Sequence, residues 1–165
     1  MFELKPLSAA AVPNALTKAE RYRLLNEPEQ CESICEDILR ADPANHQARL
    51  MLILAITDSF PHDSRQAGRA VELVQSLPSE YERHYYTGLI AERRGRALLR
   101  RKDRAVPAAS EWLHEAMASY ERADAIRPVE NDDARLRWNA CARTINASTE
   151  LTARESESTA PVMLE

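Results

Sequence analysis

Two cysteines at helical spacing are the first residues in this sequence that could do chemistry. Cys31 and Cys35 stand four residues apart, so in a helix both thiols would face one side and could ligate a metal together with a histidine. The spacing differs from that of a zinc knuckle, and no paired histidine follows. Both positions also fall on an apolar helical stripe. We therefore predict buried structural thiols and no metal site.

The other candidates for catalysis or metal binding are histidines and one pair of aspartates. The four histidines fall in different predicted elements, and none forms a metalloprotease-type pair on one helix: His46, His62, His84 and His114. Asp132 and Asp133 open a predicted helix, where the helix dipole favours acidic capping groups. No nucleophile signature supports a Ser, His and Asp triad. We predict no catalytic residue, no cofactor and no metal ligand.

Glycine is too scarce for loops that bind phosphate. The sequence has three glycines, Gly68, Gly88 and Gly95, and all of them lie inside helix-like patterns. The Walker loop and the dinucleotide fingerprint each need several glycines at fixed spacing. The formal net charge of -4 gives no general attraction to nucleic acid or to an anionic membrane.

The cysteine count and the hydropathy pattern indicate a compartment. Three cysteines make an odd and sparse set, without a disulfide framework, which suits a reducing environment. No stretch approaches the roughly 18 apolar residues of a membrane span, and residues 1–13 lack the apolar centre of a signal peptide. We therefore expect a cytoplasmic protein that does not bind membranes.

A run of basic residues is the most unusual local feature, and three interpretations of it stay open. It could bind an acidic protein, it could bind RNA or DNA, or it could be solvated or paired with Glu111, Glu115 and Glu121 of the next helix. We do not expect nucleic acid to be the ligand. The basic patch comprises Arg93, Arg94, Arg96, Arg100, Arg101, Lys102 and Arg104.

About seven helices are predicted from apolar stripes and from end signals. Asn26 is expected to cap the second helix, and Ser79 with Glu82 forms a capping box at the start of an unusually long fifth helix. The apolar run 50–56 could also be a buried strand, but no second strand exists to pair with it. The helices are expected at about 13–25, 26–42, 45–59, from 63 or 64 to 77, from 79 to well past 95, at 108–126 after an interruption at Pro107, and from 131 or 132 onward.

The closing prolines reveal a repeat. Pro43, Pro78 and Pro128 follow one another at 35 and then 50 residues, close to one period of about 34 and then a period enlarged by about 15. One helical pair cannot bury its apolar face, whereas about three stacked pairs share a continuous core. The predicted organisation is an N-terminal extension (1–11), one helical domain (12–147) and a disordered tail (148–165) rich in Ser, Thr and Glu.

The sixth helix carries the most specific family signal. Ala116, Tyr120 and Ala123, followed by Pro128, resemble the second-helix signature of the tetratricopeptide repeat family. The resemblance covers about residues 12–128, and the seventh helix resembles a terminal cap. It implies an all-α fold in which three helical pairs and a capping helix form a right-handed superhelix.

The resemblance also implies a function. Members of the family typically receive a peptide or helix of another protein on a concave surface, lined mainly by the first helix of each pair. We therefore expect an adaptor or scaffold and no enzyme, with a nucleic-acid accessory protein acting through residues 93–104 as the alternative. The identity of the partner and any self-association stay open. The groove residues implied by the resemblance are Leu16, Glu20, Arg23, Leu50, Leu54, Tyr85, Leu89 and Glu92.

Overall fold

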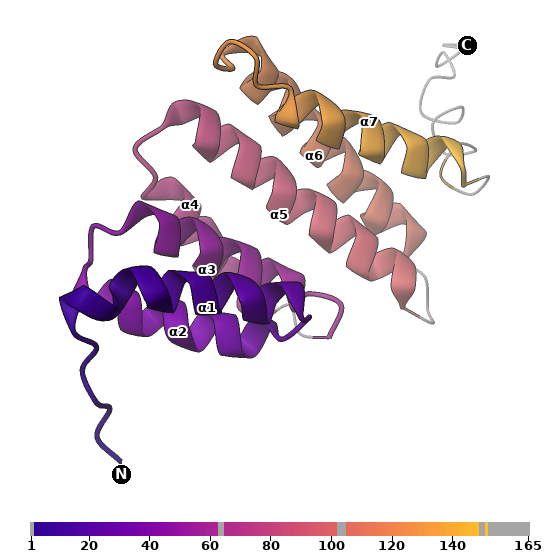
Figure 1. Ribbon diagram of the computed structural model, residues 1–165. Helices are drawn as coiled ribbons and strands as arrows, with labels where there is room; N and C mark the ends of the chain where they lie inside the picture. Colours follow the sequence, from indigo (N-terminus) through magenta and orange to yellow (C-terminus); the bar gives the residue numbers. More distant parts are fainter. Residues whose placement is uncertain (1, 63–64, 102–104, 149–150, 152–165) are drawn as a thin grey trace, which may run out of the picture. The chain divides into compact units, whose positions relative to one another are not determined.

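The computed structural model contains helices and no strand among the residues that it describes, which are 2–62, 65–101, 105–148 and 151. In the described part of the chain, seven α-helices follow a short 3-10 helix, η1 (Ala9–Ala11), and Figure 1 shows their arrangement within each unit. They are α1 (Val12–Leu24), α2 (Pro28–Ala41), α3 (His46–Asp58), α4 (Ala67–Gln75), α5 (Glu80–Arg100), α6 (Val106–Ala125) and α7 (Asp133–Asn146). The all-α fold expected from the sequence is confirmed. No helix in the described part of the chain is long and apolar enough to cross a membrane.

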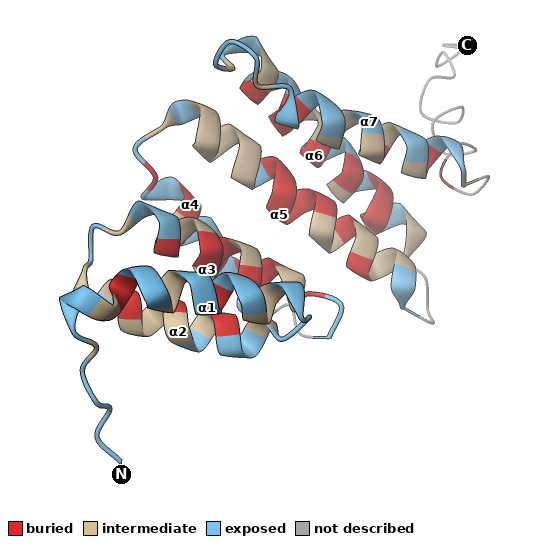
Figure 2. Cartoon of the chain, viewed as in Figure 1, coloured by how far each residue is buried: buried red, intermediate tan, exposed pale blue. Residues whose placement is uncertain are grey.

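The chain divides into two compact units, Met1–Leu77 and Pro78–Glu165. The sequence predicted one helical domain over residues 12–147, in which Pro78 closes a helical pair. The division falls at that proline, and each unit has a cluster of buried side chains of its own. Figure 2 shows these buried residues on the helices of both units.

The first unit is a four-helix assembly in which α1 packs against both α2 and α3, and α3 packs against α2 and α4. One cluster of buried side chains joins its first three helices: Val12, Ile38 and Ala48. Arg69 on α4 binds Glu32 and Glu36 of α2 through its two terminal nitrogens, at 2.7 and 2.6 Å. Because the two glutamates stand one turn apart, a single planar guanidinium meets both and ties α4 to α2.

The turn between α1 and α2 corrects the expectation that Asn26 caps the second helix. Asn26 has a φ of 61°, in the left-handed region that asparagine adopts more readily than most residues. Its N–H donates to the carbonyl of Arg23, and the N–H of Glu27 donates to that of Tyr22, which is the Schellman pattern of a helix end. Asn26 therefore closes α1, and α2 begins at Pro28, whose missing N–H needs no partner there.

Two other helix starts differ from the prediction. α4 begins at Ala67. In the loop before it Phe60 is buried, and the N–H of His62 donates to the carbonyl of Ser59. The predicted starts at residues 63 and 64 lie outside the described residues. α6 begins at Val106 and holds Pro107 in its first turn instead of starting after it, since a first-turn N–H has no intrahelical partner.

The starts of α3 and α5 are as predicted. The side chain of Asn45 accepts a hydrogen bond from the N–H of Ala48 at 2.9 Å, and Ser79 accepts one from the N–H of Glu82 at 3.3 Å. The apolar run 50–56 lies within α3 and is helical. Because side-chain oxygens satisfy these free N–H groups, the helix starts at Asn45 and Ser79 were visible in the sequence.

The second unit is built on the long antiparallel pair α5 and α6 (Figure 1). Two glycines of α5 face α6 at close range. A Cβ atom added at Gly88 would lie 2.8 Å from the ring of Tyr120, and one added at Gly95 would lie 3.1 Å from the carbonyl oxygen of Ala109. Gly88 therefore lets α5 and α6 approach closely.

The third helix of this unit, α7, packs against α6 and α5. Its apolar face contributes buried side chains to the same cluster as Tyr120: Ala134, Cys141 and Ile145. Leu151 belongs to that cluster as well and is fully buried, so the prediction of a disordered tail from residue 148 is wrong at this position. The rest of the predicted tail from residue 152 lies outside the described residues.

Gly88→Ala should destabilise the second unit, because the added methyl group would compete for space with the ring of Tyr120. We expect the free energy of unfolding to fall by about 1–3 kcal/mol, the usual cost of overpacking a core. Urea unfolding followed by circular dichroism measures the stability of the whole chain. Tryptophan fluorescence, which comes from Trp112 and Trp138 alone, reports the second unit.

Gly68→Ala is the matched control for this substitution. A Cβ atom at Gly68 meets nothing within 4 Å, and alanine is the better helix former by about 1 kcal/mol. This variant should be as stable as the original chain or slightly more stable. Equal effects at Gly68 and Gly88 would contradict the close contact between α5 and α6.

Candidate functional site

Five of the eight predicted groove residues lie on α1 and α3 of the first unit: Leu16, Glu20, Arg23, Leu50 and Leu54. Glu20 is exposed, and the other four are half-buried. Leu16 also packs against the core cluster of this unit. Because α1 and α3 are in contact, these five side chains lie on two neighbouring helices.

An ion pair joins the two helices at this face. The Nε atom of Arg23 on α1 lies 2.7 Å from a carboxylate oxygen of Asp58, the last residue of α3. Leu54 is one turn before Asp58 and therefore shares its side of α3. Both charged side chains are more than a quarter exposed, so the pair adds little stability but fixes their orientation.

The other three predicted groove residues lie on α5 of the second unit, and the structure corrects two of them. Leu89 is fully buried and Glu92 is 2% exposed, so neither side chain can line an open groove. Tyr85 is half-buried and contacts the rings of Tyr81, Tyr86 and Tyr120, with centroids 5.1–5.9 Å apart. Packing within the second unit therefore accounts for Tyr85.

Glu92 is the centre of a buried polar network instead. One of its oxygens accepts a hydrogen bond from the hydroxyl of Tyr120 at 2.8 Å, and the other accepts one from Arg96 at 2.8 Å. Arg137 of α7 lies 3.7 Å from the same second oxygen, and Arg96 also donates to the carbonyl of Ala140. Burial and the neighbouring Glu92 raise the pKa of Tyr120, which therefore stays a neutral donor.

The predicted basic patch is divided between several environments. Arg96 points into the Glu92 network, and the guanidinium of Arg94 stacks over the ring of Trp112 at 4.4 Å. Arg93 is half-buried, whereas Arg100 and Arg101 are exposed near the end of α5. Lys102 and Arg104 lie outside the described residues. Arg94 and Arg96 thus already have partners within the second unit.

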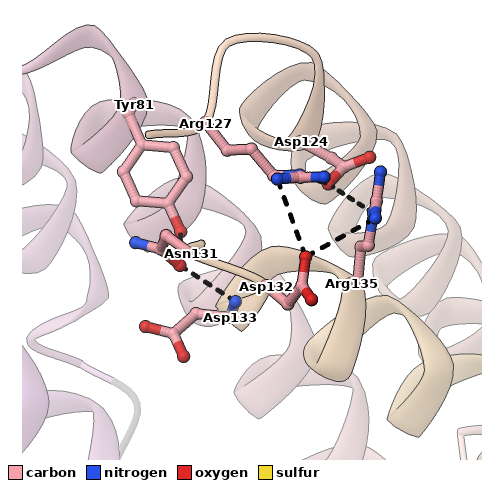
Figure 3. Close-up of polar contacts among 7 residues, drawn as sticks. All are labelled: Tyr81, Asp124, Arg127, Asn131, Asp132, Asp133 and Arg135. Atoms are coloured by element: carbon pink, nitrogen blue, oxygen red, sulfur yellow. Dashed lines mark hydrogen bonds and ion pairs between the residues drawn. The ribbon is translucent and has the colours of Figure 1, made fainter. Parts of the chain in front are cut away.

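The start of α7 carries a compact polar cluster (Figure 3). Asp132 makes no capping hydrogen bond, which corrects its prediction as a cap, and its carboxylate lies 3.7 and 3.5 Å from Arg127 and Arg135. Asn131 performs the capping role instead, because its side-chain oxygen accepts from the N–H of Asp133 and from the hydroxyl of Tyr81. Asp133 stands in the first turn, as predicted.

The three cysteines are buried and free, as predicted for Cys31 and Cys35. The thiol of Cys35 donates a hydrogen bond to the sulfur of Cys31, which lowers the pKa of Cys31 and raises that of Cys35. Burial raises the pKa of Cys141 to about 12. Among the described residues no group of three or more His, Cys, Asp or Glu side chains could hold a metal ion.

Two hollows were not predicted from the sequence. One, of about 380 Å³, lies in the first unit between residues 26–30 and the residues Asp58, Ser59 and His62. The other, of about 350 Å³, lies between α6 and α7, and its lining includes Tyr120, Glu121, Asp124, Arg135, Trp138 and Asn139. An arginine and a tryptophan three residues apart on the predicted seventh helix, Arg135 and Trp138, were the available signal for the second hollow. An apolar stripe on that helix accounted for Trp138 equally well.

Comparison with known proteins gave no match to a family model, to a curated protein or to a solved structure.

Glu92→Gln should destabilise the second unit, because it removes the negative charge that Arg96 and Arg137 face. Breaking a buried ion pair costs about 3–5 kcal/mol, and both arginines are more than a third exposed, so we expect a loss of about 1–3 kcal/mol. Urea unfolding followed by tryptophan fluorescence measures it. Glu111→Gln, at an exposed position of α6, is the control and should change stability by less than about 0.5 kcal/mol. Equal stability of the two variants would show that the Glu92 network contributes nothing.

Proposed function

We propose that this chain is an adaptor that binds a peptide or helix of another protein on the face formed by α1 and α3. The observation that carries the proposal is the contact between these two helices, with predicted groove residues on both and an ion pair between Arg23 and Asp58 across them. Half-buried Leu50 and Leu54 beside charged Arg23 and Glu20 make a surface with apolar and charged parts. Such a mixture suits a partly apolar protein ligand.

The tetratricopeptide resemblance supports the same proposal. In that family the first helices of successive pairs line the binding surface, and α1 and α3 are the first helices of the pairs α1–α2 and α3–α4. The order of packing in the first unit, α1 on α2, α2 on α3 and α1 on α3, agrees with stacked helical pairs. We propose a right-handed superhelix and a tetratricopeptide origin on this basis.

We also propose a binding role in the cytoplasm and no enzymatic activity. Free, buried cysteines suit a reducing compartment. The nucleic-acid alternative is less favoured than the adaptor, because Arg94 and Arg96 of the basic patch are engaged with Trp112 and Glu92. Their charges are therefore less available to phosphates.

Leu54→Asp should abolish capture of the partner, because it places a charge among apolar side chains of the α1–α3 face. Glu20→Lys reverses a charge at an exposed position of the same face and should weaken capture at least about tenfold, since like charges across an interface cost several kcal/mol. The measurement is affinity capture from native lysate at moderate and high salt, with quantitative mass spectrometry and nuclease-resolved detection of RNA.

The matched control is Glu72→Lys, an equal charge reversal at an exposed position of α4. Circular dichroism must show unchanged helicity for Glu20→Lys, which keeps the test valid if Leu54→Asp fails to fold. A protein that the control retains and Glu20→Lys loses supports the adaptor function. A protein retained equally by all variants excludes the α1–α3 face, and RNA that salt removes would transfer the function to the basic patch.

A further inference from the structure

The hollow between α6 and α7 is lined by side chains of both helices, and a hydrogen bond between the helices holds one of them in place. Its volume of about 350 Å³ is near the lower end of the roughly 300–1,000 Å³ of small-ligand sites, which suits one or two side chains and is too small for a helix. The indole N–H of Trp138 donates to Glu121 at 3.0 Å, so a contact between α6 and α7 holds the ring. Ala125 also lines the hollow and is exposed, so it adds apolar surface.

The charges that line the hollow are not balanced. The charged residues of the lining are Glu121, Asp124 and Arg135. Arg135 and Arg127, which is outside the lining, both lie 2.8 Å from the same oxygen of Asp124, and both face Asp132 (Figure 3). These four groups compensate one another. Glu121 differs, because in the described part of the chain its carboxylate has the neutral indole of Trp138 as a partner and no cation.

We propose that this hollow binds an arginine side chain from a basic segment of a partner protein. The guanidinium would lie beside the carboxylate of Glu121, and the aliphatic stem would lie along the ring of Trp138 and Ala125. Arginine fits better than lysine because its planar group stacks on an aromatic face and also meets a carboxylate through two nitrogens. This site is on the second unit, and it is separate from the α1–α3 face of the proposed function.

Charge complementarity favours an arginine side chain over an anion or a purely apolar side chain as the occupant of the hollow. An anion would meet the uncompensated carboxylate of Glu121 at the mouth of the hollow, and both arginines nearby are already paired with Asp124 and Asp132. Glu121 is exposed, so a purely apolar side chain would displace water from its carboxylate and offer no donor in exchange, which is unfavourable. A cation on a partly apolar stem satisfies both the ring and the carboxylate.

The test is a fluorescence titration with short synthetic peptides. In a Trp112→Phe background all tryptophan emission comes from Trp138. The probe is an acetylated peptide with a central arginine between two leucines, and its matched control replaces arginine with citrulline, which has nearly the same shape and no charge. We expect a saturable change of Trp138 emission with the arginine peptide, at least about tenfold weaker binding of the citrulline peptide, and affinity that falls as salt rises.

Glu121→Gln separates the proposed contact from general attraction to an acidic protein. It should weaken binding of the arginine peptide about tenfold, whereas Glu111→Gln, an exposed carboxylate on the same helix outside the hollow, should leave it unchanged. Equal binding of the citrulline peptide, or equal binding by Glu121→Gln, would overturn the proposal. A lysine peptide that binds as tightly as the arginine peptide would also overturn it, because the hollow would then not recognise the guanidinium group. Free acetyl-arginine amide that binds as tightly as the arginine peptide would overturn it too, because it would indicate a small-molecule ligand.

Discussion

The carboxylate of Glu92 is the group on which the packing of the second unit depends most. It belongs to α5, it accepts from Tyr120 of α6, and it faces Arg137 of α7. An ion taken out of water costs several kcal/mol unless it is paired, so the three helices must meet where those partners reach it. Arg96 adds a second link, because it donates both to Glu92 and to a carbonyl of α7. The network thereby selects one arrangement of the three helices.

Tyr120 is fully buried and lies between this interior and the hollow. Its hydroxyl is held by Glu92, the contact with Gly88 fixes how closely its helix approaches α5, and its side chain also lines the hollow between α6 and α7. The wall of the hollow is thus positioned by buried contacts, and loop conformation contributes little to it. A binding site that rests on helices held in this way is pre-organised, which lowers the entropy that a ligand must overcome.

A structural feature could be predicted from the sequence when it depends on contacts between residues that are close in the chain. The cap at Ser79 acts within three residues, so residue type and spacing were sufficient to predict it, and the helix start at Asn45 was also predicted. Asn26 could act either as a cap or as a left-handed helix end, and the choice depended on the path of the chain after α1. Pro107 was compatible with a position before the helix or in its first turn. Local rules therefore predicted the helices well and their starts less well.

The candidate site was harder to predict, because it depends on contacts between helices. Glu92 stands at a position where the family resemblance implies a groove, and nothing in its own helix shows that Tyr120, 28 residues later, will bury it. In the first unit the same reasoning placed Arg23 on the binding face, but its partner Asp58 was not identified. Charged residues are usually exposed, so sequence reasoning places them at the surface. A buried charged residue is recognised only when its partners in the folded structure are known.

The position of the hollow follows from the place of α7 at the end of the described helices. α7 buries Cys141 and Ile145 on one side and exposes Arg135, Arg143 and Leu136 on the other. No further described helix packs over its flank toward α6, so side chains at that flank are free to bond across the two helices and still face solvent. Trp138 is such a side chain, since it is fixed by α6 and only half-buried. The helix that closes the core is therefore also the element that can present an aromatic surface to a partner.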